Sequence, residues 1–235
     1  MSRVVLHLAL LVLLLLAGCA GRPSTPPQEP EFLPGTLLRF ALGQHGELRL
    51  LAVEGVLRVE DSRQPERYWL YRARDDQLFE IDRRQRVVRE YPRRHLPPRP
   101  PLAWQVTAEP SQALIHSSVR RQARALHYRF SLQNRPCYDM VVLQGRLQAV
   151  LELLRGYRQA RAAVDFARFD ADDHQRLCGE AFAYYQPQQS LQYGFPIREW
   201  AASGYTLFLS DYRPQVMLPA QRFRLPAAYR RVTAD

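Results

Sequence analysis

The chain of 235 residues carries 33 basic side chains, all of them arginine, against 23 acidic ones, for a net charge of +10. Because it lacks lysine, it cannot form the phosphate-binding loop of nucleotide hydrolases, which needs a lysine to reach the phosphates. The arginines are spread along the chain among acidic residues. This pattern predicts a dispersed solvated surface. The envelope location argued below makes a nucleic-acid partner unexpected.

The first eighteen residues are typical of a signal peptide. Arg3 gives a short positive segment, and the apolar run over 4–16 is interrupted only by His7. This run of about 13 residues is shorter than the roughly 20 that a membrane-spanning helix needs. Ala17 and Gly18 supply the small side chains that a signal peptidase expects before its cleavage site.

The segment Leu16-Ala17-Gly18-Cys19 resembles the lipobox of bacterial lipoproteins. The resemblance implies that the Cys19 sulfur is diacylated, that the chain is cleaved before it and that the new amino terminus is acylated. Two or more acyl chains give stable anchoring. The alternative is an ordinary secretory signal in which Cys19 lies near the cleavage site by chance. Ala20 stands where inner-membrane lipoproteins carry aspartate, so the resemblance implies the outer membrane, with the domain facing the periplasm.

Residues 19–35 are predicted to tether the folded domain to this lipid anchor. Five prolines stand there among small and polar residues, and such a segment cannot bury enough apolar surface to fold. We therefore expect a signal peptide over 1–18, a tether over 19–35 and one α+β domain over 36–235. The five prolines are Pro23, Pro26, Pro27, Pro30 and Pro34.

The first half of the domain is predicted to be an antiparallel meander. Alternating apolar and charged residues indicate one half-buried strand over 51–59, with a bulge near Leu50 or Leu51 before it. Short polar links that suit hairpin turns separate the next strands. A proline-rich loop over 92–101 follows, because proline removes ladder donors. The remaining strands of this half are predicted at 67–73, 77–82, 86–91, 125–133 and after Cys137.

A helical period then replaces the alternation. Leu147, Val150, Leu151 and Leu154 mark one face of a helix, and a second helix is predicted near residue 170, giving a helical insert over about 145–186. The tail returns to strands. The fold class we predict is α+β, a curved, half-barrel-like antiparallel sheet packed on a helical layer. The predicted tail strands are 197–202, 205–210, 215–218 and 223–225.

Cys137 and Cys178 are the cysteines left after Cys19 is assigned to the lipid. In an oxidising compartment an isolated pair is a candidate for a disulfide, and we predict that these two are bonded to each other. The alternative is two buried thiols, with Cys178 on the apolar face of the second helix.

No standard catalytic motif is present, so the chain is not expected to be an enzyme, and no cofactor is predicted. The acidic residues near His174 lack the glycine and the distal glutamate of a calcium loop, and helix capping with solvated charge explains them better. His174 and Cys178 could face each other on a helix but lack further ligands, so no metal site is predicted.

The closing segment 193–232, with its Gly-x-Pro and Leu225-Pro226 elements, resembles an uncharacterised envelope family related to the Lol-type lipoprotein carriers. That resemblance implies a half-open barrel whose concave face receives acyl chains. Our first hypothesis is therefore a non-enzymatic envelope lipoprotein that binds an apolar ligand, lipid or lipoprotein there. The alternative is a structural or assembly lipoprotein that binds another envelope protein through the sheet edge or the arginine-rich surface. Four aromatic residues could line the ligand site, although such residues are more often ordinary sheet core: Tyr68, Tyr71, Phe130 and Phe208.

Overall fold

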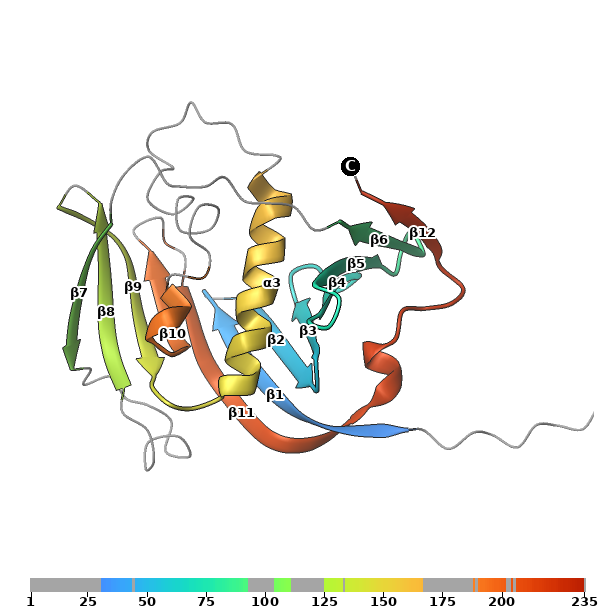
Figure 1. Ribbon diagram of the computed structural model, residues 1–235, viewed down its shortest axis with the longest axis horizontal. Coiled ribbons are helices and arrows are strands. Elements are labelled where there is room, and N and C mark those ends of the chain that lie inside the picture. The colour runs from blue at the N-terminus through green and yellow to red at the C-terminus, as the bar shows by residue number, and fades with distance from the viewer. Residues whose placement is uncertain are drawn as a thin grey trace, which may run out of the picture. The chain divides into compact units, whose positions relative to one another are not determined.

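The computed structural model describes residues 31–43, 45–92, 104–110, 125–132, 134–166, 188, 190–201, 204 and 206–234. In this part of the chain, strands form a single open, curved sheet in the order β12-β6-β5-β4-β3-β2-β1-β11-β10-β9-β8-β7. Neighbouring strands are antiparallel except β12 and β6, which are parallel. The residues from Phe32 onward make up one structural unit (Figure 1).

The strands are β1 (Phe32–Leu42), β2 (Gly46–Val53), β3 (Val56–Asp61), β4 (Arg67–Arg72), β5 (Gln77–Asp82), β6 (Val87–Tyr91), β7 (Trp104–Pro110), β8 (Ala125–Leu132), β9 (Arg135–Leu143), β10 (Phe195–Ala201), β11 (Thr206–Pro219) and β12 (Arg230–Thr233). The helical elements are α3 (Gln148–Phe166) and the short 3-10 helices η2 (Ser190–Tyr193) and η3 (Ala220–Phe223).

The inner face of the sheet is the face against which α3 packs. Val150, Leu151 and Leu154 of α3 share one buried cluster with Leu57 and Leu78 of the sheet. The helix contacts β3, β4 and β5, and these strands lie beside it in Figure 1. The concave side of the curved sheet is thus filled by a helix.

The outer face is covered over part of its area by the chain that follows β11. Leu51, Leu70 and Ile81 are fully buried there, together with Leu218 and with Phe223 of η3. Where both faces of a strand are covered, its residues are apolar on both sides, as at Leu50 and Leu51 of β2. A third cluster, built on Phe130, Met140 and Val142, lies at the β8–β9 end of the sheet.

The prediction of one strand over 51–59 is wrong. The chain turns at Glu54 and Gly55, and β2 and β3 pair with each other, with Val53 opposite Val56. Gly55 has a φ of +68°, in the left-handed region that a tight turn requires and that glycine adopts without strain. The strands at 67–73, 77–82, 86–91 and 125–133 are confirmed within a residue or two at each end.

The tail also differs from the expectation. The segments 205–210 and 215–218 belong to one long strand, β11, which bends at two register shifts against β1. Residue 223 ends η3, and residues 224 and 225 follow it without forming a strand, whereas β12 was not predicted.

The tether boundary also moves, because β1 begins at Phe32. Over residues 32–35 this strand pairs with β11, and its pairing with β2 begins at Thr36. Pro34 therefore lies where only one side is paired, a position at which a strand tolerates proline.

The predicted helical layer is reduced to a minor element. Over the described residues one α-helix packs on the sheet, and the fold is mostly β. The helical insert is present over Gln148–Phe166. Its predicted second helix lies outside the described residues.

Candidate functional site

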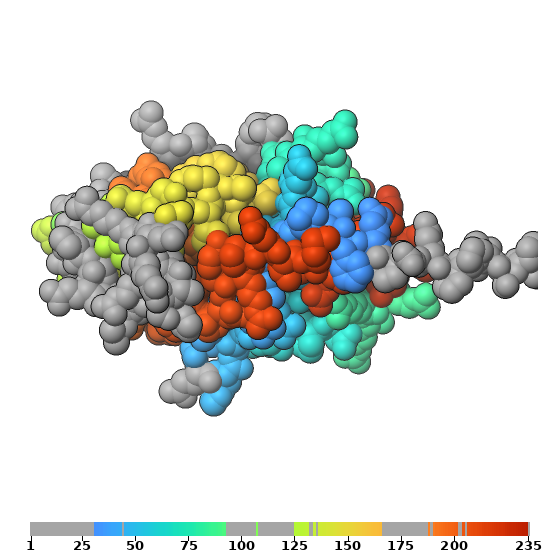
Figure 2. All heavy atoms as spheres, turned by 90° about the horizontal axis from the view of Figure 1, so that it is seen from below, coloured from blue at the N-terminus to red at the C-terminus, as the bar shows by residue number. Residues whose placement is uncertain are grey.

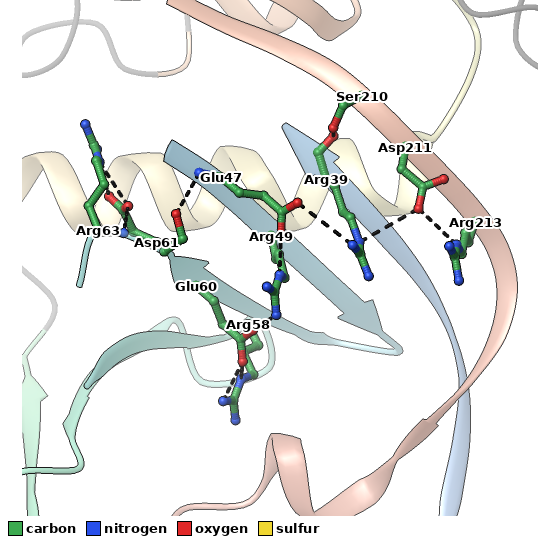
Figure 3. A network of polar contacts seen from close by, with 11 residues as sticks. Arg39, Glu47, Arg49, Arg58, Glu60, Asp61, Arg63, Ser210, Asp211 and Arg213 are labelled. Atoms are coloured by element: carbon green, nitrogen blue, oxygen red, sulfur yellow. Dashed lines mark hydrogen bonds and ion pairs between the residues drawn. The ribbon is translucent and has the colours of Figure 1, made fainter. Parts of the chain in front are cut away.

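A row of charged residues crosses the outer face of the sheet where η3 and the C-terminal segment do not cover it. The strand register places Asp211, Arg39, Arg49, Glu60 and Tyr68 directly opposite one another on five neighbouring strands. Directly opposed residues of an antiparallel pair share a face. We call the charged residues of this row, with their neighbours Glu47, Arg58 and Arg213, the polar ladder (Figure 3).

Arginine and carboxylate alternate along the ladder. Arg213 Nε lies 2.9 Å from Asp211 Oδ2, and Arg49 Nε lies 2.5 Å from Glu47 Oε1. Arg39 lies between these two pairs, with its Nε 3.8 Å from Asp211 and its Nη1 3.9 Å from Glu47. Arg39 is thus held by charge at distances longer than a hydrogen bond.

The register sets Arg39 directly opposite Arg49, an arrangement of like charges that would be unfavourable by itself. Glu47 compensates for it, because its carboxylate reaches both arginines (Figure 3). The hydrogen bond to Glu47 holds the pKa of Arg49 above its usual value. The Glu47 amide in turn donates to the Ser62 hydroxyl, which fixes the start of β2 against the end of β3.

Arg58 is the buried member of the ladder and lies in the outer core. The Arg58 guanidinium donates to Glu60 Oε1 at 2.7 Å and to the Arg222 carbonyl oxygen of η3 at 2.7 Å. It also lies 3.6 Å above the Tyr68 ring. Burial lowers the pKa of Arg58, and Glu60 offsets part of this change, whereas burial raises the pKa of Tyr68.

The rest of the ladder is open to solvent. The side chains of Arg49 and Arg213 are 41% and 59% exposed. Phe208, which is 44% exposed, lies opposite Ala41 in the adjoining row, and Ala41 lies opposite Glu47. The outer face therefore presents an exposed aromatic ring beside arginines that carboxylates hold in place.

A second polar cluster joins β8, β9 and β10. The buried Asp139 carboxylate accepts from Arg129 Nε at 2.9 Å and lies 2.8 Å from His127 Nε2. The imidazole stacks on Trp200, which is opposite Asp139 in the sheet.

An ion pair and a cation–π contact also bind α3 to the sheet. Arg158 of α3 donates to Glu199 at 2.6 Å, and Glu199 is almost fully buried. Arg161 lies 4.0 Å above the Trp69 ring. The buried charge of Glu199 and the half-buried charge of Arg161 therefore serve to attach α3 to the sheet.

The four aromatic residues predicted to line a ligand site do not lie together. Tyr71 is buried in the inner cluster beneath α3, and Tyr68 is buried in the outer cluster. Phe130 is fully buried in the third cluster. Phe208 is exposed on the outer face. Sequence alternation identified them as strand residues but could not assign them to a common face.

The lipidation residue Cys19 lies outside the described residues, and so does Cys178. Cys137 is buried in β9 and is a disulfide cysteine. Its partner is not among the described residues, and the Cys137–Cys178 pairing stays a prediction.

Sequence reasoning missed the polar ladder. Its members come from segments as distant as Arg39 and Arg213, and the alternation of charge appears only once the strands are paired. The local signal available was the spacing of two between opposite charges, as in Glu47 and Arg49 or Arg58 and Glu60. Such spacing places two residues on the same face of a strand.

No group of three or more histidine, cysteine, aspartate or glutamate residues suited to a metal ion occurs in the part of the chain that the structure describes. In the same part, no helix is both long and apolar enough to cross a membrane.

No protein-family model and no curated protein matches the chain. Among solved structures, an uncharacterised conserved protein from Thermus thermophilus is similar over 86% of this chain and 91% of its own, with 12% identity and a TM-score of 0.41. A structure of PNGF-II is similar over 86% of this chain, with 5% identity and a TM-score of 0.42, and the match spans 31% of that protein. At these TM-scores neither likeness supports a statement about function.

Proposed function

We propose that the chain is a lipid-anchored protein of the bacterial cell envelope that binds another envelope protein through the outer face of its sheet. The observation that carries this proposal is the polar ladder with Phe208 beside it. Arginine and aromatic residues are enriched at protein interfaces, where they supply much of the binding energy.

The energetics favour recognition over stabilisation as the role of the exposed ladder residues. Exposed ion pairs contribute little to folding, with a median of about 0–1 kcal/mol. Carboxylates that already hold the arginines reduce the entropy lost when a partner binds. The ion pairs of Arg39 are longer than hydrogen bonds, so its guanidinium can still donate to a partner carboxylate.

The anchor is the second part of the proposal and rests on the lipobox resemblance. We expect Cys19→Ala to abolish acylation and to release the protein from the membrane fraction. Acyl labelling that survives this substitution would show that Cys19 is not the modified residue.

The partner is tested by photo-crosslinking in intact cells. A photoreactive amino acid at position 208 should give an adduct with one envelope protein. Combining it with Arg49→Glu should lower the adduct yield at least about tenfold, the effect of losing one strong interface contact. The matched control is Arg84→Glu, an exposed arginine in the turn between β5 and β6, which makes the same charge change away from the ladder. Equal yields from the two variants, or no protein adduct at all, would overturn the proposal.

Binding of an acyl chain to the inner face is the second candidate. The observation in its favour is the continuous apolar surface beneath α3, to which β1, β2 and β3 contribute Phe40, Leu50 and Leu57. Because α3 fills this surface, an acyl chain could enter only if the helix moved away. Mass spectrometry of lipid extracted from the purified protein tests this candidate, and a stoichiometric fatty acid or phospholipid beyond the anchor would favour it.

A further inference from the structure

Exposed apolar residues lie at the end of the β1–β11 pair where β1 begins and β11 ends. Phe32 lies opposite Pro219, and Pro34 lies opposite Met217. We call Phe32, Pro34, Met217 and Pro219 the strand tip. Phe32 is 46% exposed and Met217 is 56% exposed, and with Phe208 they are the exposed large hydrophobic side chains of the described residues. Figure 2 shows the surface on which β1, in blue, and β11, in orange-red, lie side by side.

Phe32 and Met217 of the strand tip are not buried in the inner or the outer cluster. Strand alternation directs Leu33 and Leu218 to the outer core, where Leu218 is buried. Phe32 and Met217 alternate with these residues and so point to the opposite face, and neither belongs to the inner cluster. Exposed apolar groups that a fold does not use for its own core mark an interaction surface when they lie together.

The position of the tip in the chain indicates what it contacts. Phe32 is the first residue of β1, and about a dozen residues separate it from Cys19, a length that spans at most about 40 Å when fully extended. Among the strand residues, those at the start of β1 are thus connected most directly to the anchor. A tether of this length keeps the tip at a high effective concentration near the bilayer, so even a weak affinity suffices for contact.

The flanking charges suit an anionic bilayer surface. Arg222 and Arg224 follow Met217 in the chain, in and after η3. Arg224 is exposed. Arginines at the edge of an apolar surface attract anionic headgroups while the apolar side chains enter the interfacial layer.

We propose that Phe32, Pro34, Met217 and Pro219 form a membrane-contacting tip that rests in the interfacial layer of the bilayer to which Cys19 is attached. This inference rests on the proposed lipid anchor and extends it, because it assigns the part of the folded domain that touches the membrane. The anchor then supplies attachment, and the tip restricts the orientation of the domain.

The test uses the full chain, expressed with its leader in a bacterial host, with a photoreactive amino acid at position 32 or 217. Position 208 is the matched control because its exposure is similar and it lies in a different part of the sheet. After illumination of the membranes, mass spectrometry should find phospholipid adducts at 32 and 217. Their yield should exceed that at 208, because the proposal places positions 32 and 217, and not 208, in the interfacial layer.

The outcomes separate the tip from the anchor. The mass of the amino-terminal peptide in the same sample reports whether Cys19 is acylated. Three results would overturn the tip and leave the anchor intact, provided that Cys19 is acylated. These results are no lipid adduct at 32 or 217, equal lipid yields at 208, and protein adducts at the tip in place of lipid. An unmodified Cys19 would overturn the anchor and, with it, the tip.

Discussion

Gly156 shows how one residue sets the distance between α3 and the sheet. A Cβ atom built at this position would collide with the Tyr71 hydroxyl and with the ring carbon that carries it. The tyrosine cannot easily move away, since its ring is buried and its hydroxyl donates to Asp76 at 2.9 Å. The glycine therefore permits a close approach that no other residue would allow.

We expect Gly156→Ala to lower the free energy of unfolding by about 1–3 kcal/mol, as overpacking of a core usually does. Helix propensity alone would predict the opposite sign, a gain of about 1 kcal/mol. Urea titration of the purified domain gives the change.

The matched control for this clash is the same substitution made together with Tyr71→Leu. In that background the colliding hydroxyl and ring are gone, so Gly156→Ala should become neutral or stabilising. A stabilising Gly156→Ala in the native background would show that the helix can shift to accept the methyl group.

Tyr157, the next residue of α3, packs against the inner cluster, and burial raises its pKa to about 12. An unfolded chain releases a tyrosine proton near pH 10, so above that pH the unfolded state binds fewer protons than the folded state. The contribution of Tyr157 is complete below about pH 10 and is lost as the pH rises toward about 12. We expect Tyr157→Phe to lose thermal stability less steeply over this interval than the parent protein. Parallel curves of Tm against pH would contradict the assignment.

At the scale of elements, hydrophobic alternation located most strands but not all of their ends. The prediction of one strand over 51–59 failed because β2 is apolar on both faces, with Leu50 and Ala52 inside and Leu51 and Val53 outside. The alternation therefore continues through the turn without a visible break. Gly55 was the local signal of the turn.

The long strand β11 was divided in the prediction for a different reason. Pro214 lacks an N–H and ordinarily ends a ladder. Here the chain accommodates it within a register shift between Leu37 and Gly35 of β1, where Gln215 takes a φ of +55°. A bulge of this kind depends on the partner strand, which the local sequence does not specify.

Arg58 attaches the C-terminal segment to the outer face, and its loss should affect that element first. We expect Arg58→Met to lower the free energy of unfolding by about 1–3 kcal/mol, since the Arg222 carbonyl oxygen loses a buried charged donor. Amide hydrogen exchange over 219–225 should become faster than in the parent protein.

Arg49→Met is the control for this prediction. Arg49 is on the same face and pairs with the same Glu60, but it is 41% exposed. Its loss should cost less than about 1 kcal/mol and should leave exchange near η3 unchanged. Equal destabilisation by the two substitutions would contradict the distinction between the buried and exposed ends of the ladder.

At the scale of the whole molecule, the open curved sheet could be predicted, whereas the candidate site could not. Local alternation and turn residues are properties of short segments. The ladder instead needs the register of β11, β1, β2 and β3, four strands whose order in the sheet is not their order in the chain. Tyr68 and Tyr71, by contrast, lie three residues apart on β4, so strand alternation alone places them on opposite faces and in different clusters.

The last prediction concerns the covalent link across the helical insert. Cys137 is a disulfide cysteine in β9, and we expect its partner to be Cys178, because acylation would consume the sulfur of Cys19. The bond would close a loop of about 40 residues that includes α3, and chain entropy alone gives a stabilisation of about 4 kcal/mol for a loop of this length. Native strain can remove part of that gain.

We therefore expect Cys178→Ser to lower the free energy of unfolding by about 2–4 kcal/mol and to expose one free thiol at Cys137 in the denatured, unreduced protein. Peptide mapping of the parent protein without reductant should recover one linked pair that contains residues 137 and 178. In the parent, titration of the denatured chain should find neither of these thiols free. A linked pair that joins Cys137 to Cys19 would contradict both this prediction and the lipid anchor, since one sulfur cannot form a disulfide and a thioether at once.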